Sequence, residues 1–104
     1  MINHTMLVKF ADSIPDAELD QFLGDIEGAT KATGVLESFA ARRHIRVPGE
    51  EQIPAFIASV VVQLRVADVA AFGALLSDPA VGEVFDVWRG RRPFEVAWVN
   101  HEVL

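Results

Sequence analysis

The sequence predicts a single α+β domain in which a four-stranded antiparallel sheet carries helices on one face. Segments with the two-residue alternation of strands and segments with helical spacing follow one another in the order β-α-β-β-α-β. The 104 residues, 51% of them hydrophobic, are enough for one core and too few for two domains. We therefore expect residues 1–104 to form one domain.

The first half of the sequence predicts a strand, a helix and a second strand. Residues 2–10 alternate as a strand does, and one face holds Ile2, His4, Met6, Val8 and Phe10. A helix is expected to begin at Ser13-Ile14-Pro15-Asp16, where Ser13 can cap the first turn. Apolar residues then recur at helical spacing until Gly34, which is expected to end the helix. Residues 36–45 form the second expected strand.

The second half predicts a turn, a strand, a broken helix and a last strand. Pro48-Gly49-Glu50-Glu51 is the clearest turn sequence in the chain. The third strand is expected over residues 56–64, and its β-branched run at 60–62 is typical of a central strand. A helix begins at Asp68 and restarts at Asp78-Pro79, with Asp78 as cap and Pro79 in the first turn. Residues 94–103 alternate again as a strand.

This element order is the ferredoxin-like, split βαβ arrangement. Two helical segments cover only one face of such a sheet, so the other face, with Leu7, Ala97 and Val99, needs a cover as well. Pairing two sheets face to face provides that cover. We therefore expect a homodimer through the sheet face, which makes a dimeric α/β barrel.

Composition and charge exclude several classes of protein. The formal net charge of −6 disfavours a nucleic-acid binder, which normally presents a basic surface to phosphates. The chain has no cysteine, so disulfides, thiolate nucleophiles and sulfur-based zinc sites are excluded. The N-terminus does not resemble a signal peptide, and the longest apolar stretch, residues 53–64, is too short to span a bilayer. We expect a cytoplasmic protein with no membrane partner.

His4 is the best single candidate for chemistry. A histidine on an otherwise apolar strand face titrates near neutral pH and can move protons in a pocket. The alternative is a core histidine whose ring nitrogens are satisfied by neighbours. Candidate partners on adjacent elements are Asn100, Ser59 and Gln63, and the sequence does not choose among them.

The sequence patterns for a metal site or an anion site are weaker than the pattern that singles out His4. The three histidines are far apart in the sequence and lack the spacing of a metal site, so no metal site is expected. Two basic clusters, at residues 42–46 and 89–92, are compatible with an anion clamp at a cavity mouth. The same residues are better explained by structure: residues 89–92 complement the negative end of a helix, and the first cluster lies beside acidic neighbours such as Glu50 and Glu51.

Two segments carry a family resemblance. Ile2-Asn3-His4-Thr5-Met6-Leu7-Val8-Lys9-Phe10 resembles the start of the stress-responsive dimeric A/B-barrel (Dabb) proteins, and Leu75-Leu76-Ser77-Asp78-Pro79-Ala80-Val81 resembles their second helical segment. The resemblance implies a cavity between helices and sheet, faced by His4. In the family's plant polyketide cyclases a Tyr and a His act together, and the matching positions here are Leu75 and Val81. The chain contains no tyrosine, so that pair is absent.

Two functions remain open. The first is a homodimeric protein that binds a small apolar or aromatic metabolite, including as a cofactor-free cyclase or isomerase in which His4 handles protons. Its cavity would be lined by Met6, Val8, Phe22, Ile26, Leu75, Val81, Phe85, Trp88 and Trp98. The alternative is a non-catalytic oligomer with a stress-protective or structural role. No cofactor is expected for either function.

Overall fold

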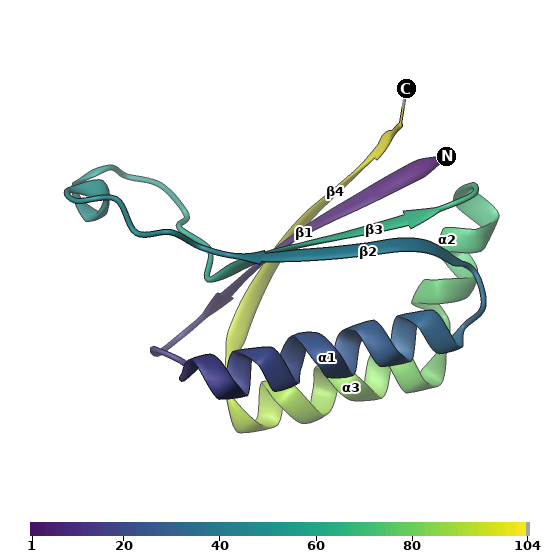
Figure 1. Cartoon of the computed structure of the whole chain (residues 1–104), viewed down its shortest axis with the longest axis horizontal. Coiled ribbons are helices and arrows are strands. Elements are labelled where there is room, and N and C mark those ends of the chain that lie inside the picture. The colour runs from purple at the N-terminus through teal and green to yellow at the C-terminus, as the bar shows by residue number, and fades with distance from the viewer. Residues whose placement is uncertain (104) are drawn as a thin grey trace.

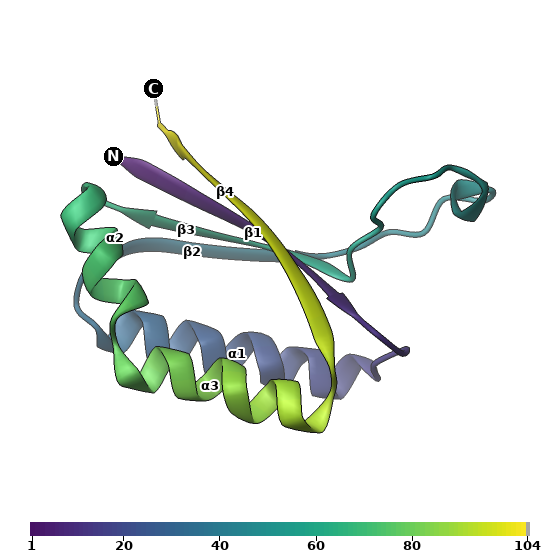
Figure 2. The same cartoon turned by 180° about the vertical axis from the view of Figure 1, so that it is seen from behind.

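The computed structural model describes residues 1–103, and its elements follow the predicted order (Figure 1). They are β1 (Ile2–Phe10), α1 (Asp16–Ala32), β2 (Leu36–Arg43), the 3-10 turn η1 (Glu50–Gln52), β3 (Val60–Val66), α2 (Val69–Leu76), α3 (Pro79–Arg91) and β4 (Phe94–Glu102). The four strands form one antiparallel sheet in the order β2-β3-β1-β4. Helices α1 and α3 lie side by side under one face of this sheet, and α2 closes one end (Figure 2). The predicted ferredoxin-like fold is confirmed.

The ends of α1 are set by backbone conformation. The helix begins at Asp16 with Pro15 in the N-cap position, so the prediction that Ser13 caps it is wrong. Ser13 lies outside the first turn, where its hydroxyl does not satisfy the first N–H groups. At the other end Gly34 has φ +78° and its N–H donates to the Lys31 carbonyl at 3.1 Å. Only glycine adopts this left-handed conformation without strain, so the predicted helix stop is confirmed.

Helix α3 is capped by Asp78, as the sequence predicts. The Asp78 carboxylate accepts from the backbone N–H groups of Ala80 at 2.9 Å and Val81 at 3.2 Å, and Pro79 occupies the first turn. These bonds satisfy donors that a helix start leaves free. The cap therefore fixes where α3 begins beneath the sheet.

Removing this cap should weaken the fold by a measurable amount. We expect Asp78→Ala to lower the free energy of unfolding by about 1 kcal/mol, because two backbone donors lose their acceptor. Urea denaturation measures the change. Glu83→Ala on the exposed side of the same helix serves as control and should differ from the parent by less than about 0.5 kcal/mol. An equal loss in both variants would contradict the assigned cap.

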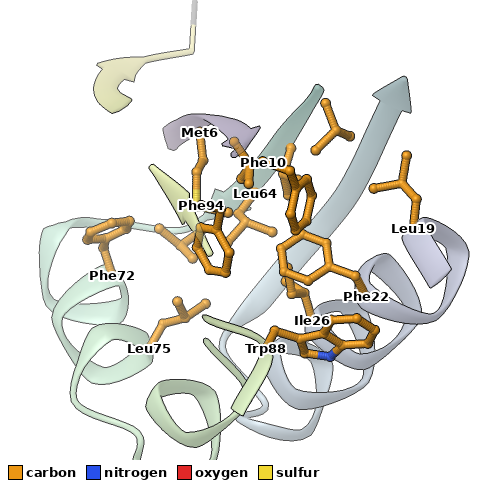
Figure 3. Close-up of a cluster of buried hydrophobic side chains, with 14 residues drawn as sticks. Met6, Phe10, Leu19, Phe22, Ile26, Leu64, Phe72, Leu75, Trp88 and Phe94 are labelled. Atoms are coloured by element: carbon orange, nitrogen blue, oxygen red, sulfur yellow. The ribbon is translucent and has the colours of Figure 1, made fainter. Parts of the chain in front are cut away.

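The core lies between the helices and the inner face of the sheet (Figure 3). Phe22 of α1 is its centre: its ring meets Phe10, Trp88 and Phe94 edge-on at centroid distances of 5.2–5.6 Å. The Trp88 indole N–H donates to the Asp25 carboxylate at 2.8 Å, which satisfies the polar atom of an otherwise buried ring. The aromatic cluster fills the end of the interior where β1 leads toward α1.

The third strand begins four residues later than predicted. Residues 44–59 instead leave the sheet as a projecting arm around η1 (Figure 1). The neighbouring strands explain the correction, because Val60 is paired with Arg43 at the end of β2 and with Val8 near the end of β1. Ser59 still bonds both neighbours, with its N–H donating to the Val8 carbonyl at 2.7 Å and its carbonyl accepting from the His44 N–H at 2.9 Å, and regular pairing stops there although the composition of residues 56–59 favours a strand. At the other end β3 continues to Val66 because β1 and β2 both extend there.

No helix formed by the described residues lies over the outer face of the sheet (Figure 1). Strand pairing places Leu7 between Val61 and Ala97, and Thr5 beside Val99 in the adjacent row. Leu7 is 36% exposed and Val99 is 58% exposed. This is the uncovered apolar face that the element order predicts.

Candidate functional site

A cavity of about 270 Å³ lies between the inner face of the sheet and helices α2 and α3. Its wall is mostly apolar, with the polar side chains of His4, Thr30 and Arg89 among the lining residues. The apolar part consists of Met6, Leu64, Leu75, Leu76, Val81, Gly82, Phe85, Val96 and Trp98. The strands supply the flat side of the cavity, and α2 and α3 supply the curved side. The volume is slightly below the ~300 Å³ at which ligand pockets usually begin, so the space suits a small molecule.

The structure brings together six of the ten residues predicted for a site. His4, Met6, Leu75, Val81, Phe85 and Trp98 all line this cavity. The other four lie in the packed core instead, each with at most 2% of its surface exposed: Val8, Phe22, Ile26 and Trp88. Trp88 lies three residues beyond Phe85 on α3, and that rotation turns it toward Asp25 of α1.

His4 is held on the cavity wall by its neighbour across the sheet. His4 in β1 is paired with Asn100 in β4, and its Nδ1 lies 2.7 Å from the Asn100 Oδ1. The imidazole also packs between two aromatic rings, with centroids 4.8 Å from Phe72 and 5.1 Å from Trp98. Of the three partners that the sequence leaves open, the structure selects Asn100. Ser59 instead accepts from the Phe10 backbone N–H at 3.1 Å.

The Asn100 contact determines which ring nitrogen of His4 carries the proton. An amide oxygen only accepts hydrogen bonds, so Nδ1 is the donor and Nε2 of the neutral ring carries the lone pair. Within residues 1–103, Nε2 has no hydrogen-bond partner, and no fully buried side-chain nitrogen or oxygen is left unpaired. Nε2 therefore remains accessible to a molecule in the cavity.

Burial lowers the pKa of His4 below its ordinary value of about 6.5, against a smaller opposing effect of the Asn100 hydrogen bond. The apolar surroundings disfavour the imidazolium, while the amide oxygen favours it. The ring is consequently neutral at pH 7. A neutral imidazole with a fixed Nδ1–H is the form that accepts a proton at Nε2.

This shift predicts a pH dependence of stability. The unfolded chain protonates His4 at a higher pH than the folded chain does, so folding stability is full above about pH 6.5 and falls as the pH drops through that value. We expect the His4→Gln variant to lose less folding stability than the parent when the pH is lowered, because it lacks the titrating imidazole. Urea unfolding at about pH 7.5 and about pH 5.5 measures it, with the lower pH about one unit above the ordinary pKa of glutamate. If the variant loses as much stability as the parent between the two pH values, the lowered pKa of His4 would be contradicted.

Six residues of the cavity wall are absent from the lining residues predicted from the sequence: Thr30, Leu64, Leu76, Gly82, Arg89 and Val96. Of these, Arg89 belongs to the 89–92 cluster, which the sequence offers as an anion clamp at a cavity mouth. A signal for Arg89 exists, because positions 81, 85 and 89 recur at four-residue spacing and share one face of a helix. The basic cluster obscures that signal, since Arg89 is followed by Arg91 and Arg92. Thr30 and Leu64 lie on segments whose patterns give no sign of which buried residues meet a void.

Three of the other six arginines, Arg43, Arg46 and Arg92, have acidic partners. Arg92 binds the Glu18 carboxylate through two nitrogens, at 2.6 and 3.0 Å, and this contact lowers the pKa of Glu18 and raises that of Arg92. In the arm, His44 bonds Glu50 at 2.7 Å and Arg46 bonds Glu51 at 2.8 Å. The explanation by Glu50 and Glu51 is thus confirmed for His44 and Arg46, whereas the Glu18 partner of Arg92 is not one that the sequence indicates.

Residues 1–103 contain neither a metal-binding cluster nor a membrane-spanning helix. No group of three or more histidine, cysteine or acidic side chains is placed so as to hold a metal ion. No helix in this range has the length and apolar character needed to cross a bilayer.

Comparisons with known proteins agree on the fold. No family model matches the chain, and no curated protein matches its sequence significantly. Among solved structures, a Dabb family protein from Mesorhizobium loti is similar with a TM-score of 0.74 and 20% identity, over 99% of this chain and 96% of that chain. A dimeric ferredoxin-like protein from Thermobifida fusca gives 0.72 and 15%, over 98% and 90%.

An enzyme also shares this architecture. The hydroxynitrile lyase from Passiflora edulis is similar with a TM-score of 0.77 and 11% identity, over 99% of this chain and 93% of the lyase. Each likeness extends over nearly the whole of both chains, so it concerns the complete domain. The chain therefore has the ferredoxin-like fold seen in Dabb proteins, as its opening strand and second helical segment predict.

Proposed function

We propose that this protein is a homodimer that binds a small apolar or aromatic molecule in the cavity beside His4, and that His4 moves a proton to or from that molecule. One observation carries the proposal: a neutral imidazole, fixed by Asn100, exposes Nε2 on an otherwise mostly apolar cavity wall. A polar group in such a place is typical of a ligand site, where few polar contacts orient an apolar molecule. The similar lyase supports an enzymatic use of this fold.

The chemistry that follows is acid–base catalysis without a cofactor. Nε2 is able to take a proton from a carbon next to a carbonyl group, and the resulting imidazolium is able to return it at another atom. The Asn100 amide oxygen accepts a hydrogen bond from Nδ1–H in both the neutral and the protonated imidazole. Asn100 therefore holds the His4 ring in place while the charge of the ring changes. Proton transfers of this kind are the steps of an isomerase or a cyclase.

The homodimer is supported by the outer face of the sheet. Leu7, Val61, Ala97 and Val99 form a continuous apolar surface there, and the similar Thermobifida fusca protein is dimeric. A second copy of the same sheet matches this surface in shape and polarity, as in a closed two-fold dimer. The dimer leaves the cavity on the opposite, helix-covered side.

Ligand binding is tested by filling the cavity without disturbing the fold. Gly82 lies on the cavity wall, and a Cβ added there meets no atom within 4 Å. We expect Gly82→Leu to lower the affinity for 2-tetralone, a small uncharged bicyclic ketone, by at least about tenfold. Titration calorimetry measures the affinity. Gly90→Leu is the matched control, because Gly90 lies on the same helix outside the cavity and is equally unobstructed.

Both leucines replace a helical glycine and should leave the fold intact, because leucine is the better helix former. Equal loss or equal retention of affinity in the two variants would contradict binding in this cavity.

A non-catalytic role is favoured by one observation of its own. Leu75 and Val81 make the wall opposite His4 apolar, so the cavity has no second proton-handling group at those positions. A structural or protective oligomer would bind 2-tetralone weakly or not at all, and His4 would serve only to join β1 to β4. The Gly82 and Gly90 pair separates this alternative from the proposed function.

A further inference from the structure

Arg89 lies at the end of the cavity farthest along α3. Val81, Gly82, Phe85 and Arg89 share one face of this helix, and all four line the cavity. The helical rise places Arg89 about 12 Å beyond Val81 along the axis. On the strands the cavity likewise extends from the His4–Asn100 pair toward Val96, which is paired with Val8. The imidazole and the guanidinium thus lie toward opposite ends of an apolar space.

The guanidinium of Arg89 is held in place, and most of its N–H groups are available to a ligand. Its carbon lies 4.7 Å from the centre of the Phe94 ring, a cation–π contact that orients the planar group. Its one acidic neighbour within residues 1–103 is Asp86, at 3.5 Å, and both side chains are largely exposed. Arg92, by contrast, uses two nitrogens on Glu18 at 2.6 and 3.0 Å. Arg89 therefore keeps most of its donor fork available.

A helix C-terminus alone does not account for this placement. Cations in the last turn stabilise the negative end of a helix, and Arg89 and Arg91 both lie there. Arg91 serves this purpose while its guanidinium lies over Trp88, 4.7 Å from the ring centre and outside the cavity. Arg89 differs from Arg91 in that it lines the cavity. An arginine fork at the mouth of an apolar space is suited to a planar anionic group on the bound molecule.

We propose that Arg89 binds the carboxylate of the ligand, so that the cavity takes a flat, apolar monocarboxylic acid whose other end meets His4. This inference rests on the proposed function, because it assigns the ligand class of the same cavity. Arg89 is the one cationic side chain that residues 1–103 place on the wall, so it pairs with one anionic group, and the apolar residues between the two ends require an uncharged body. A carboxylate at Arg89 would direct the far end of the molecule toward Nε2.

The test compares two probes of equal size. 2-Naphthoate carries a carboxylate, and 2-naphthamide replaces it with an uncharged amide on the same ring system. We expect the parent protein to bind the carboxylate at least about tenfold more tightly, as a charge-assisted hydrogen bond at a partly exposed site provides. In Arg89→Gln the two affinities should become equal, while the affinity for 2-naphthamide stays as in the parent. Arg91→Gln is the matched control and should keep the preference.

The outcomes separate the two proposals. Equal affinities in the parent, or an undiminished preference in Arg89→Gln, would overturn the role of Arg89 and leave the cavity site standing. Failure of both probes to bind the parent would overturn the proposed function as well. Unchanged binding of 2-naphthamide by Arg89→Gln shows that the variant is folded, and Arg89→Lys, which keeps the charge without the fork, should restore part of the preference.

Discussion

In the His4→Gln variant, deuterium uptake at the acidic carbon of bound 2-tetralone is expected to fall about 100-fold, the usual contribution of a positioned general base. Glutamine matches the length of the side chain but has no basic nitrogen at the position of Nε2. The exchange is followed by proton NMR in heavy water and does not require the natural substrate to be known. It tests whether His4 moves protons in the cavity rather than merely fills space.

The pH profile and a second histidine make this test specific. In the parent, the exchange rate should rise with pH and then reach a plateau. Because burial lowers the pKa of His4, the midpoint of this rise should lie at a lower pH than the ordinary imidazole pKa. His44→Gln changes a histidine of the arm that bonds Glu50, so its exchange rate should match the parent's. A rate in His4→Gln equal to the parent's, at unchanged 2-tetralone affinity, would show that His4 has no proton-handling role.

The second large effect concerns the dimer. Val99→Glu places a carboxylate on the outer face of the sheet within the proposed interface, and the symmetry of a dimer places two there. An unpaired charge buried in this way costs about 3–5 kcal/mol, so we expect the dissociation constant to rise several hundredfold. Sedimentation equilibrium at micromolar concentration should then show a monomer.

Val87→Glu is the control for this experiment. Val87 lies on α3 and is 52% exposed, close to the 58% of Val99, but it is on the helix side of the molecule. The same substitution there should leave the dimer intact. Dissociation in both variants, or in neither, would contradict an interface on the outer face of the sheet.

The regular elements were predictable because local signals and tertiary contacts agree. In β1, the alternating residues His4, Met6, Val8 and Phe10 are all buried. The break at Asp78-Pro79 separates α2 from α3 as its capping chemistry requires. The third strand was misplaced because its start is decided by where pairing with its neighbours ends, at Arg43 of β2 on one side and at Val8 of β1 on the other. Sequence spacing within one segment does not contain that information.

The site was predictable only in part, for a related reason. Periodicity separates inward-facing from outward-facing residues, and it correctly predicts that Met6 and Trp88 both face the interior. It does not show which inward-facing residues meet a void and which meet another side chain. That depends on how α1, α2 and α3 lie under the sheet, so Trp88 packs in the core while Arg89 reaches the cavity.

The most direct measurement of the central claim locates a bound molecule by NMR. With 2-tetralone bound, intermolecular nuclear Overhauser effects should connect its protons to the Met6 methyl group and to the Leu75 methyl groups, which line the cavity. Contacts only to Leu7 and Val99 would instead place the molecule on the outer face of the sheet and would contradict a ligand site beside His4.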